Sequence, residues 1–195
     1  MLRSNIENIA NQVLSKYVVK GGAYKQFEKI CAGENIAYQE IEADEKHFCG
    51  VFTKYLDEQK HIIINSKIDN EGRKNFTKAH ELGHYFLGHQ LKNNAFYCFD
   101  HEIIEDGLHQ DNIENEANYF ATCLLMPEGK VVSAFKALLK NSRHYQSLGF
   151  LFVTNSTYGI WCGIRDALTK RYGVSEEALR YRLKSLRLID FDKYM

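Results

Sequence analysis

Two histidines and a glutamate lie close together in this chain, as His80, Glu81 and His84. On a helix, residues four apart share one face with Cβ atoms roughly 5–6 Å apart, so the two imidazoles can bind one metal ion. Imidazole nitrogens bind zinc at about 2.0–2.1 Å. Glu81 lies about 100° round the helix from His80, where its carboxylate can reach a water on the metal. Zinc lowers the pKa of that water to about 7, and the carboxylate can take its proton. The spacing therefore predicts zinc-dependent hydrolysis.

The His-Glu-x-x-His pattern is typical of zincins, but two surface histidines on an exposed helix would look the same in a chain with 8 His. The residues around it favour a buried site. The histidine face is also the apolar face, because helical spacing relates Phe76, Ala79, His80, Gly83 and Leu87. Buried histidines without a partner are costly, whereas zinc satisfies both. Gly83 costs a helix about 1 kcal/mol relative to alanine, which indicates close approach of another backbone or a tolerated weak position.

A catalytic zinc usually has three protein ligands and one open position. The metzincin extension would need glycine and histidine where this chain has Leu87 and Gln90, so that extension is absent. His89 would lie about 140° round a continuing helix from His84, which makes it a poor ligand. The third ligand is therefore expected elsewhere in the chain.

The helix predicted over 113–126 offers two glutamates. At about 100° per residue, Glu114 lies within roughly 50° of the centre of its apolar face, and Glu116 roughly 110° away. We therefore predict Glu114 as the third ligand and Glu116 as an exposed acid. Asn118 could orient a ligand or satisfy a buried backbone group. Four residues are candidates for stabilising the oxyanion, and the sequence does not choose among them: Tyr85, His101, His109 and Tyr119.

Other segments in the first two thirds of the chain are predicted to form helices and strands that can position these residues. Apolar periodicity predicts helices over 4–19 and 24–31, then strands over 36–41, 50–56 and 61–65, then the histidine helix over 70–89. Residues 90–112 are polar and read as a solvated loop. The fold class expected is α+β: a zincin-like metallopeptidase with a small three-stranded sheet packed on the active-site helix, followed by a C-terminal helical part. An edge of such a sheet can receive an extended peptide.

The C-terminal third reads as a helical subdomain. We predict a boundary that separates a core over 1–128 from a subdomain over 129–195, with a helix over 128–139 and a strand or loop within 141–161. A helix-turn-helix-like pair covers 164–187, with Ser175 capping its second helix. That helix is basic, with Arg180, Arg182, Lys184 and Arg187. It could contact DNA, but its apolar residues are explained by packing, which is the interpretation that we favour.

The amino-acid composition limits the classes of protein to which this chain can belong. The 195 residues contain 25 Lys+Arg and 25 Asp+Glu, so net charge gives no general attraction to nucleic acid or membrane. The N-terminus lacks the apolar core of a signal peptide, and no apolar run approaches the ~20 residues of a membrane span. The 5 Cys are scattered without a Cys-x-x-Cys pair. We therefore expect reduced thiols in a soluble cytoplasmic protein.

Two longer motifs carry a family resemblance. The first is Arg73-x-x-Phe76-Thr77-x-Ala79-His80-Glu81-Leu82-Gly83-His84, and the second is Glu114-x-x-Ala117-Asn118-x-Phe120-Ala121-x-x-Leu124-Leu125-Met126-Pro127. Together they resemble the ImmA/IrrE family of zinc metallopeptidases, although the family's usual Leu-Gly-Leu near the end reads Leu186-Arg187-Leu188 here. The resemblance implies His80, His84 and Glu114 as zinc ligands and Glu81 as general base, in agreement with the helical geometry.

The function expected is that of a cytoplasmic zinc endopeptidase. The resemblance implies a protein substrate, a helix-turn-helix transcriptional repressor of the kind found in mobile elements and prophages. The rival from another class is a DNA-binding or regulatory scaffold protein with a structural or vestigial zinc site. Glu81 distinguishes the endopeptidase hypothesis from the scaffold hypothesis, because a structural zinc site needs no acid beside its first histidine.

Overall fold

The computed structural model describes residues 1–17, 22–45, 47–54, 59–90, 95–99, 112–140 and 149–192, which form helices and two sheets. In chain order the elements are α1 (Arg3–Tyr17), the 3-10 helix η1 (Ala23–Gln26), α2 (Phe27–Gly33), β1 (Ile36–Ile41), β2 (Phe48–Lys54), β3 (Lys60–Asn65), α3 (Glu71–Phe86), β4 (Ala95–Phe99), α4 (Asn112–Leu125), α5 (Glu128–Leu139), β5 (Leu151–Val153), α6 (Tyr158–Tyr172), α7 (Glu176–Ser185) and β6 (Ile189–Phe191). This arrangement confirms the α+β class. Within these ranges, no helix has the length and apolar character needed to cross a membrane.

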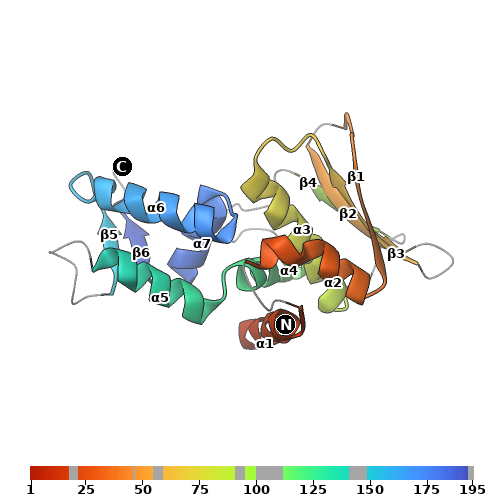
Figure 1. The fold of residues 1–195 in the computed structure, drawn as a ribbon, viewed down its shortest axis with the longest axis horizontal. Coiled ribbons are helices and arrows are strands. Elements are labelled where there is room, and N and C mark those ends of the chain that lie inside the picture. Colours follow the sequence, from red (N-terminus) through yellow and green to blue (C-terminus); the bar gives the residue numbers. More distant parts are fainter. Residues whose placement is uncertain are drawn as a thin grey trace.

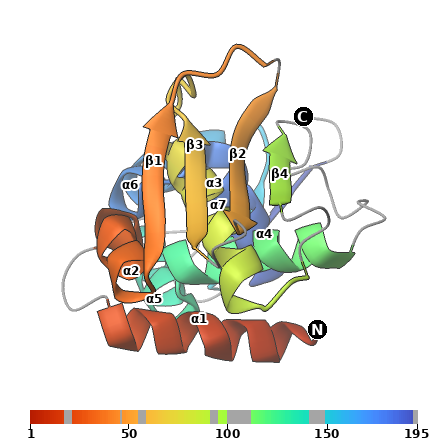
Figure 2. The same ribbon diagram turned by 90° about the vertical axis from the view of Figure 1, so that its right-hand side faces the viewer.

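The larger sheet has the strand order β1-β3-β2-β4 and lies against α3, as Figure 2 shows. β1 runs parallel to β3, and β2 runs antiparallel to both β3 and β4. The sheet therefore has one strand more than we predicted, because β4 falls within the segment that we read as a polar loop. Alternation in this short segment explains the strand: Phe96 and Cys98 are buried, whereas Tyr97 between them is exposed.

Helix α3 has clear signals at both ends. The Asn70 side chain accepts a hydrogen bond from the backbone N–H of Arg73 and caps the start of the helix. The helix ends at Phe86, three residues before the predicted end. Gly88 follows in the left-handed region at φ 68°, which only glycine adopts at no cost. His89 consequently lies beyond the helix, and its position cannot be calculated from helical rotation.

Helices α3 and α4 cross at very short range. A Cβ added at Gly83 would lie 3.0 Å from Cα and 3.1 Å from the carbonyl oxygen of Ala117. Of the two interpretations of Gly83, close approach of another backbone is therefore the one that the structure supports. On α4, the predicted apolar face is confirmed as core, with Phe120, Ala121 and Leu124 almost fully buried.

The C-terminal elements lie beside the first part in Figure 1. Strands β5 and β6 pair in parallel, and β6 was not predicted. Helix α6 begins at Tyr158, earlier than the predicted start at Ile164. The predicted cap of α7 is confirmed, since the Ser175 side chain accepts a hydrogen bond from the N–H of Ala178. Residues 141–148 lie outside the described ranges, and the domain boundary near 128 stays a prediction.

Arg182 connects the two parts instead of facing solvent. Its side chain is 0% exposed. Nε donates to the carbonyl oxygen of Met126 at 3.0 Å, and a guanidinium N–H donates to the Glu7 carboxylate at 3.0 Å. The guanidinium of Arg182 therefore links the end of α4 to α1, which places one of the three basic residues of α7 out of reach of any external partner.

Removing the acid that faces Arg182 should weaken the fold. We expect Glu7→Ala to lower the free energy of unfolding by about 1–3 kcal/mol, because a buried charged group loses a hydrogen-bonded partner. Urea denaturation of the two proteins measures this difference. Asn8→Ala, an exposed substitution on the same helix, is the matched control and should change stability by less than about 0.5 kcal/mol. Equal stability of the two variants would contradict the linking role of Arg182.

Candidate metal centre

His80, His84 and Glu114 lie together between α3 and the first turn of α4, with their ligand atoms within 4.8 Å of one another. The two Nε2 atoms are 2.9 Å apart. A Glu114 carboxylate oxygen lies 3.1 Å from Nε2 of His80 and 3.5 Å from Nε2 of His84. The structure thus brings together all three residues that the sequence proposed as ligands.

The spacing of these atoms fits a metal ion. Ligands at about 2.0–2.1 Å around a tetrahedral centre lie about 3.3 Å from one another. The three observed distances, 2.9, 3.1 and 3.5 Å, bracket that value. The histidine side chains are 0% and 1% exposed and that of Glu114 is 14% exposed, so water is largely excluded from the donors. Two imidazoles and one carboxylate are the same donor types that hold zinc in some catalytic sites.

The electrostatics of the cluster favour a shared cation. Burial lowers the pKa of His84 to about 4, so this imidazole is neutral at pH 7 and can donate its lone pair. Burial pushes the pKa of the Glu114 carboxyl upward, but hydrogen bonds from both histidines outweigh it, and the net pKa is well below its usual range. For His80, burial lowers the pKa, whereas Glu114 and Glu81 raise it, and the net direction is upward. A proton or a metal ion can satisfy this arrangement, and a metal would displace the proton.

Asn118 contacts the ring nitrogen of His80 that faces away from the cluster. Its side-chain oxygen lies 2.8 Å from Nδ1 of His80, and Asn118 is only 7% exposed. An amide oxygen only accepts, so Nδ1 must donate, which leaves Nε2 with its lone pair facing the cluster. This contact agrees with the first of the two roles considered for Asn118, the orientation of a ligand, which stays a prediction.

Strand β4 adds two residues that the sequence did not indicate. The ring of Phe96 stacks on His84 with centroids 4.2 Å apart and planes at 11°. Cys98 lies within 4.8 Å of donor atoms of both His80 and Glu81, a second group that could hold a metal ion. Both were missed because β4 was read as loop, although the short, aromatic-rich apolar run over 95–99 is a signal for a strand.

Glu81 is 0% exposed and stands beside the cluster without belonging to the His80–His84–Glu114 group. It belongs to the second group, with His80 and Cys98. The oxyanion candidates are less well placed. The Tyr85 hydroxyl donates to Glu34 at 2.9 Å, and the Tyr119 ring lies below the guanidinium of Arg3 at 5.1 Å. His101 and His109 lie outside the described residues.

The prediction of Glu116 as an exposed acid is wrong. Its side chain is 17% exposed, and a carboxylate oxygen lies 3.3 Å from Nε2 of His89. The helical-wheel argument placed Glu116 away from the core of α4, but the chain that follows α3 covers that side. The wheel describes one helix alone, whereas burial depends on its neighbours.

The fold and the paired helices with their His₂Glu cluster define the zincin-like class. More particularly, the chain belongs to the IrrE N-terminal-like domain family, Peptidase M78, whose model matches residues 33–184. The family resemblance seen in the sequence is thereby confirmed. The family is named for a peptidase, and the described part of the chain contains a cluster that could hold a metal ion.

A solved structure of a Mycobacterium tuberculosis transcriptional regulator is similar, with a TM-score of 0.57 and 16% identity. The likeness covers 92% of this chain and 47% of that one, so this chain spans about half the length of the regulator. At this identity the comparison shows the shared fold alone. No curated protein matches the sequence.

Gly83 should be essential for the approach of α4. We expect Gly83→Ala to destabilise the metal-free protein by about 1–3 kcal/mol, because the new methyl meets the α4 backbone and outweighs the helix-propensity gain of about 1 kcal/mol. Urea denaturation measures the change. Gly163→Ala is the matched control, since Gly163 lies inside α6 and an added Cβ meets nothing within 4 Å. That variant should be stabilised by up to about 1 kcal/mol. A similar increase in stability for Gly83→Ala and Gly163→Ala would show that α3 and α4 do not cross tightly.

Proposed function

We propose that the protein is a zinc-dependent endopeptidase of the cytoplasm. The observation that supports this most is the convergence of His80, His84 and Glu114 on one point, with the buried carboxylate of Glu81 beside it. A structural zinc site has no use for a second acid beside its ligands. The five cysteines are all free thiols, which agrees with a reducing compartment.

His80, His84 and Glu114 would hold the ion. Zinc bound there would supply a Lewis acid that polarises a peptide carbonyl and lowers the pKa of a bound water to about 7. Glu81 would take a proton from the attacking water and deliver it to the leaving amine. Asn118 and Phe96 keep the two imidazoles oriented, the first by a hydrogen bond and the second by stacking.

The substrate proposed is an extended segment of another protein. β4 is an edge strand of the described sheet, and its Phe96 contacts a proposed ligand directly. The backbone groups of an edge strand can pair with an added peptide strand, which would lie beside the metal. The family implies a helix-turn-helix transcriptional repressor as that protein, and the similarity to a transcriptional regulator agrees with a regulatory role.

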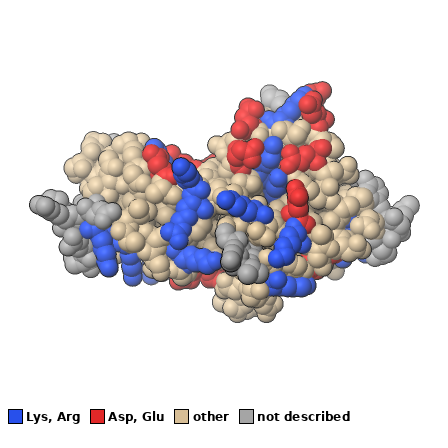
Figure 3. All heavy atoms as spheres, viewed as in Figure 1, with Lys and Arg blue, Asp and Glu red and all other residues tan. Residues whose placement is uncertain are grey.

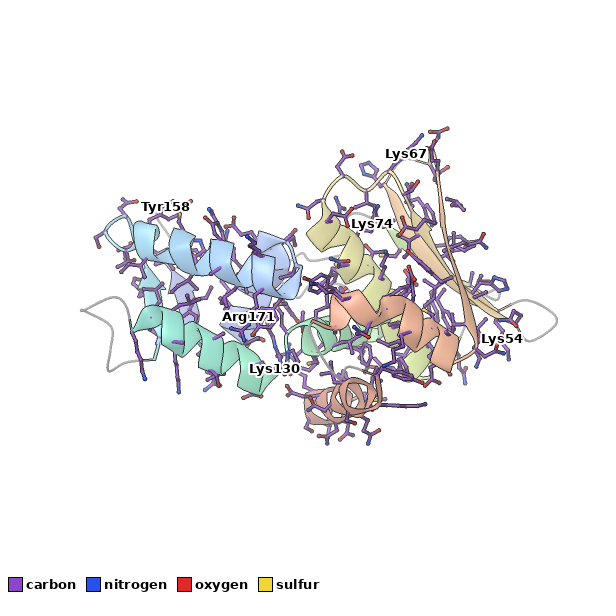
Figure 4. The ribbon with its side chains drawn as sticks, viewed as in Figure 1. Lys54, Lys67, Lys74, Lys130, Tyr158 and Arg171 are labelled. Atoms are coloured by element: carbon purple, nitrogen blue, oxygen red, sulfur yellow. The ribbon has the colours of Figure 1, made fainter. Side chains whose placement is uncertain are left out.

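The DNA-binding rival receives little support from α7. Arg182 is buried, and the Arg180 guanidinium lies over the Phe191 ring at 4.1 Å. Figure 3 shows Lys and Arg side chains near the middle of the face seen in Figure 1, with acidic side chains among them. Two basic residues, Lys130 of α5 and Arg171 of α6, are labelled in Figure 4. Both line one pocket at the junction of the two parts. Binding of duplex DNA that weakens steeply with salt would favour the rival.

The test of the proposed mechanism begins with zinc per chain, measured by elemental mass spectrometry on protein purified without chelator. We expect one zinc per chain in the wild type and in Glu81→Gln, and its loss in Glu114→Ala. Cleavage of a helix-turn-helix repressor by Glu81→Gln should fall about 10²–10⁴-fold, because the general base is missing. Glu71→Gln, an exposed acid in the first turn of the same helix, is the control and should cleave normally. Full activity of Glu81→Gln would rule the mechanism out.

A further inference from the structure

The end of α3 turns the chain back onto a proposed metal ligand. The backbone N–H of Gly88 donates to the carbonyl of Tyr85 at 3.1 Å, and that of His89 donates to the carbonyl of His84 at 3.1 Å. With Gly88 at φ 68°, these two bonds form a Schellman motif. The motif fixes the backbone of His89 against the last turn of the helix, so its side chain starts close to that of His84.

The two imidazoles meet through their Nδ1 atoms, which lie 3.0 Å apart. On its other side, Nε2 of His89 lies 3.3 Å from a carboxylate oxygen of Glu116. The His89 side chain is 6% exposed, and Phe96 packs against both rings, stacked on His84 and edge-on to His89 at 6.1 Å. A continuous chain of polar contacts therefore runs from Glu116 through His89 to His84.

Hydrogen-bonding chemistry determines which atom donates and which accepts in each of these contacts. A carboxylate only accepts, so Nε2 of His89 donates to Glu116. In the neutral ring, Nδ1 of His89 is then an acceptor, and Nδ1 of His84 must be the donor. His84 is left with the lone pair of Nε2 facing His80 and Glu114. Asn118 selects the same tautomer at His80, so both histidines present Nε2 to one point.

We propose that His89 and Glu116 are positioning residues for His84, which fix its tautomer and ring orientation for metal binding. The proposal rests on the proposed function, because it assumes that His84 is a ligand. Its physical reason is general: the second nitrogen of a ligating histidine usually bonds a partner that orients the ring, and loss of the partner weakens metal binding. Neither residue touches the metal position, and neither is needed as a ligand.

The experiment compares zinc dissociation constants, measured by chelator competition, for four variants. His89→Leu fills the space but accepts no hydrogen bond, and we expect zinc affinity to fall about 10–100-fold. His89→Asn places an amide oxygen near the former Nδ1, so it should recover most of that loss. Glu116→Ala should weaken zinc binding in the same direction, and it tests the relay even if His89→Leu does not fold. Glu128→Ala removes an exposed acid from α5 and should bind zinc as the wild type does.

A second readout separates positioning from a merely structural role. The visible spectrum of the cobalt-substituted protein reports the geometry of the ligands, and it should change in His89→Leu and return toward the wild type in His89→Asn. Thermal unfolding of the metal-free proteins should differ little. If His89→Leu and Glu116→Ala bind zinc with wild-type affinity and the cobalt spectrum is unchanged, the relay is wrong and the zinc site stands. If the wild type itself binds no zinc, the proposed function fails, and the relay fails with it.

Discussion

The close crossing of α3 and α4 is the constraint on which the site depends. Gly83 meets the backbone of Ala117, and the proposed ligands lie within a turn of that contact, His80 and His84 on one helix and Glu114 on the other. A larger side chain at position 83 would separate the helices. Glycine here weakens its own helix but allows three donor atoms to converge within a few ångströms.

The three donor side chains can lie this close together because their charges are balanced locally. One carboxylate and two imidazoles leave room for a cation, and every nitrogen that faces away from the centre has a partner: Asn118 for His80, His89 for His84. Buried polar groups that are fully hydrogen-bonded hold a single arrangement, whereas partly bonded ones destabilise it. Donors held in this way would need little rearrangement to hold a metal ion.

The sheet and the C-terminal elements support this centre from opposite sides. β4 places Phe96 on the ring of His84 and Cys98 near Glu81, so the sheet edge and the donors are held as one unit. From the other side, Arg182 of α7 bonds the carbonyl of Met126 at the end of α4. A basic residue that would suit DNA in an isolated helix-turn-helix pair is here a buried structural link.

The sequence by itself determined the local features. Helical spacing identified His80, His84 and Glu114, and capping chemistry located the start of α7, because such signals act within a few residues. The tertiary structure decided what surrounds them. β4 becomes a strand by pairing with β2, Glu116 becomes half-buried because the turn after α3 covers it, and His89 reaches His84 only through that turn. These outcomes depend on contacts between segments distant in sequence, which periodicity within one segment does not encode.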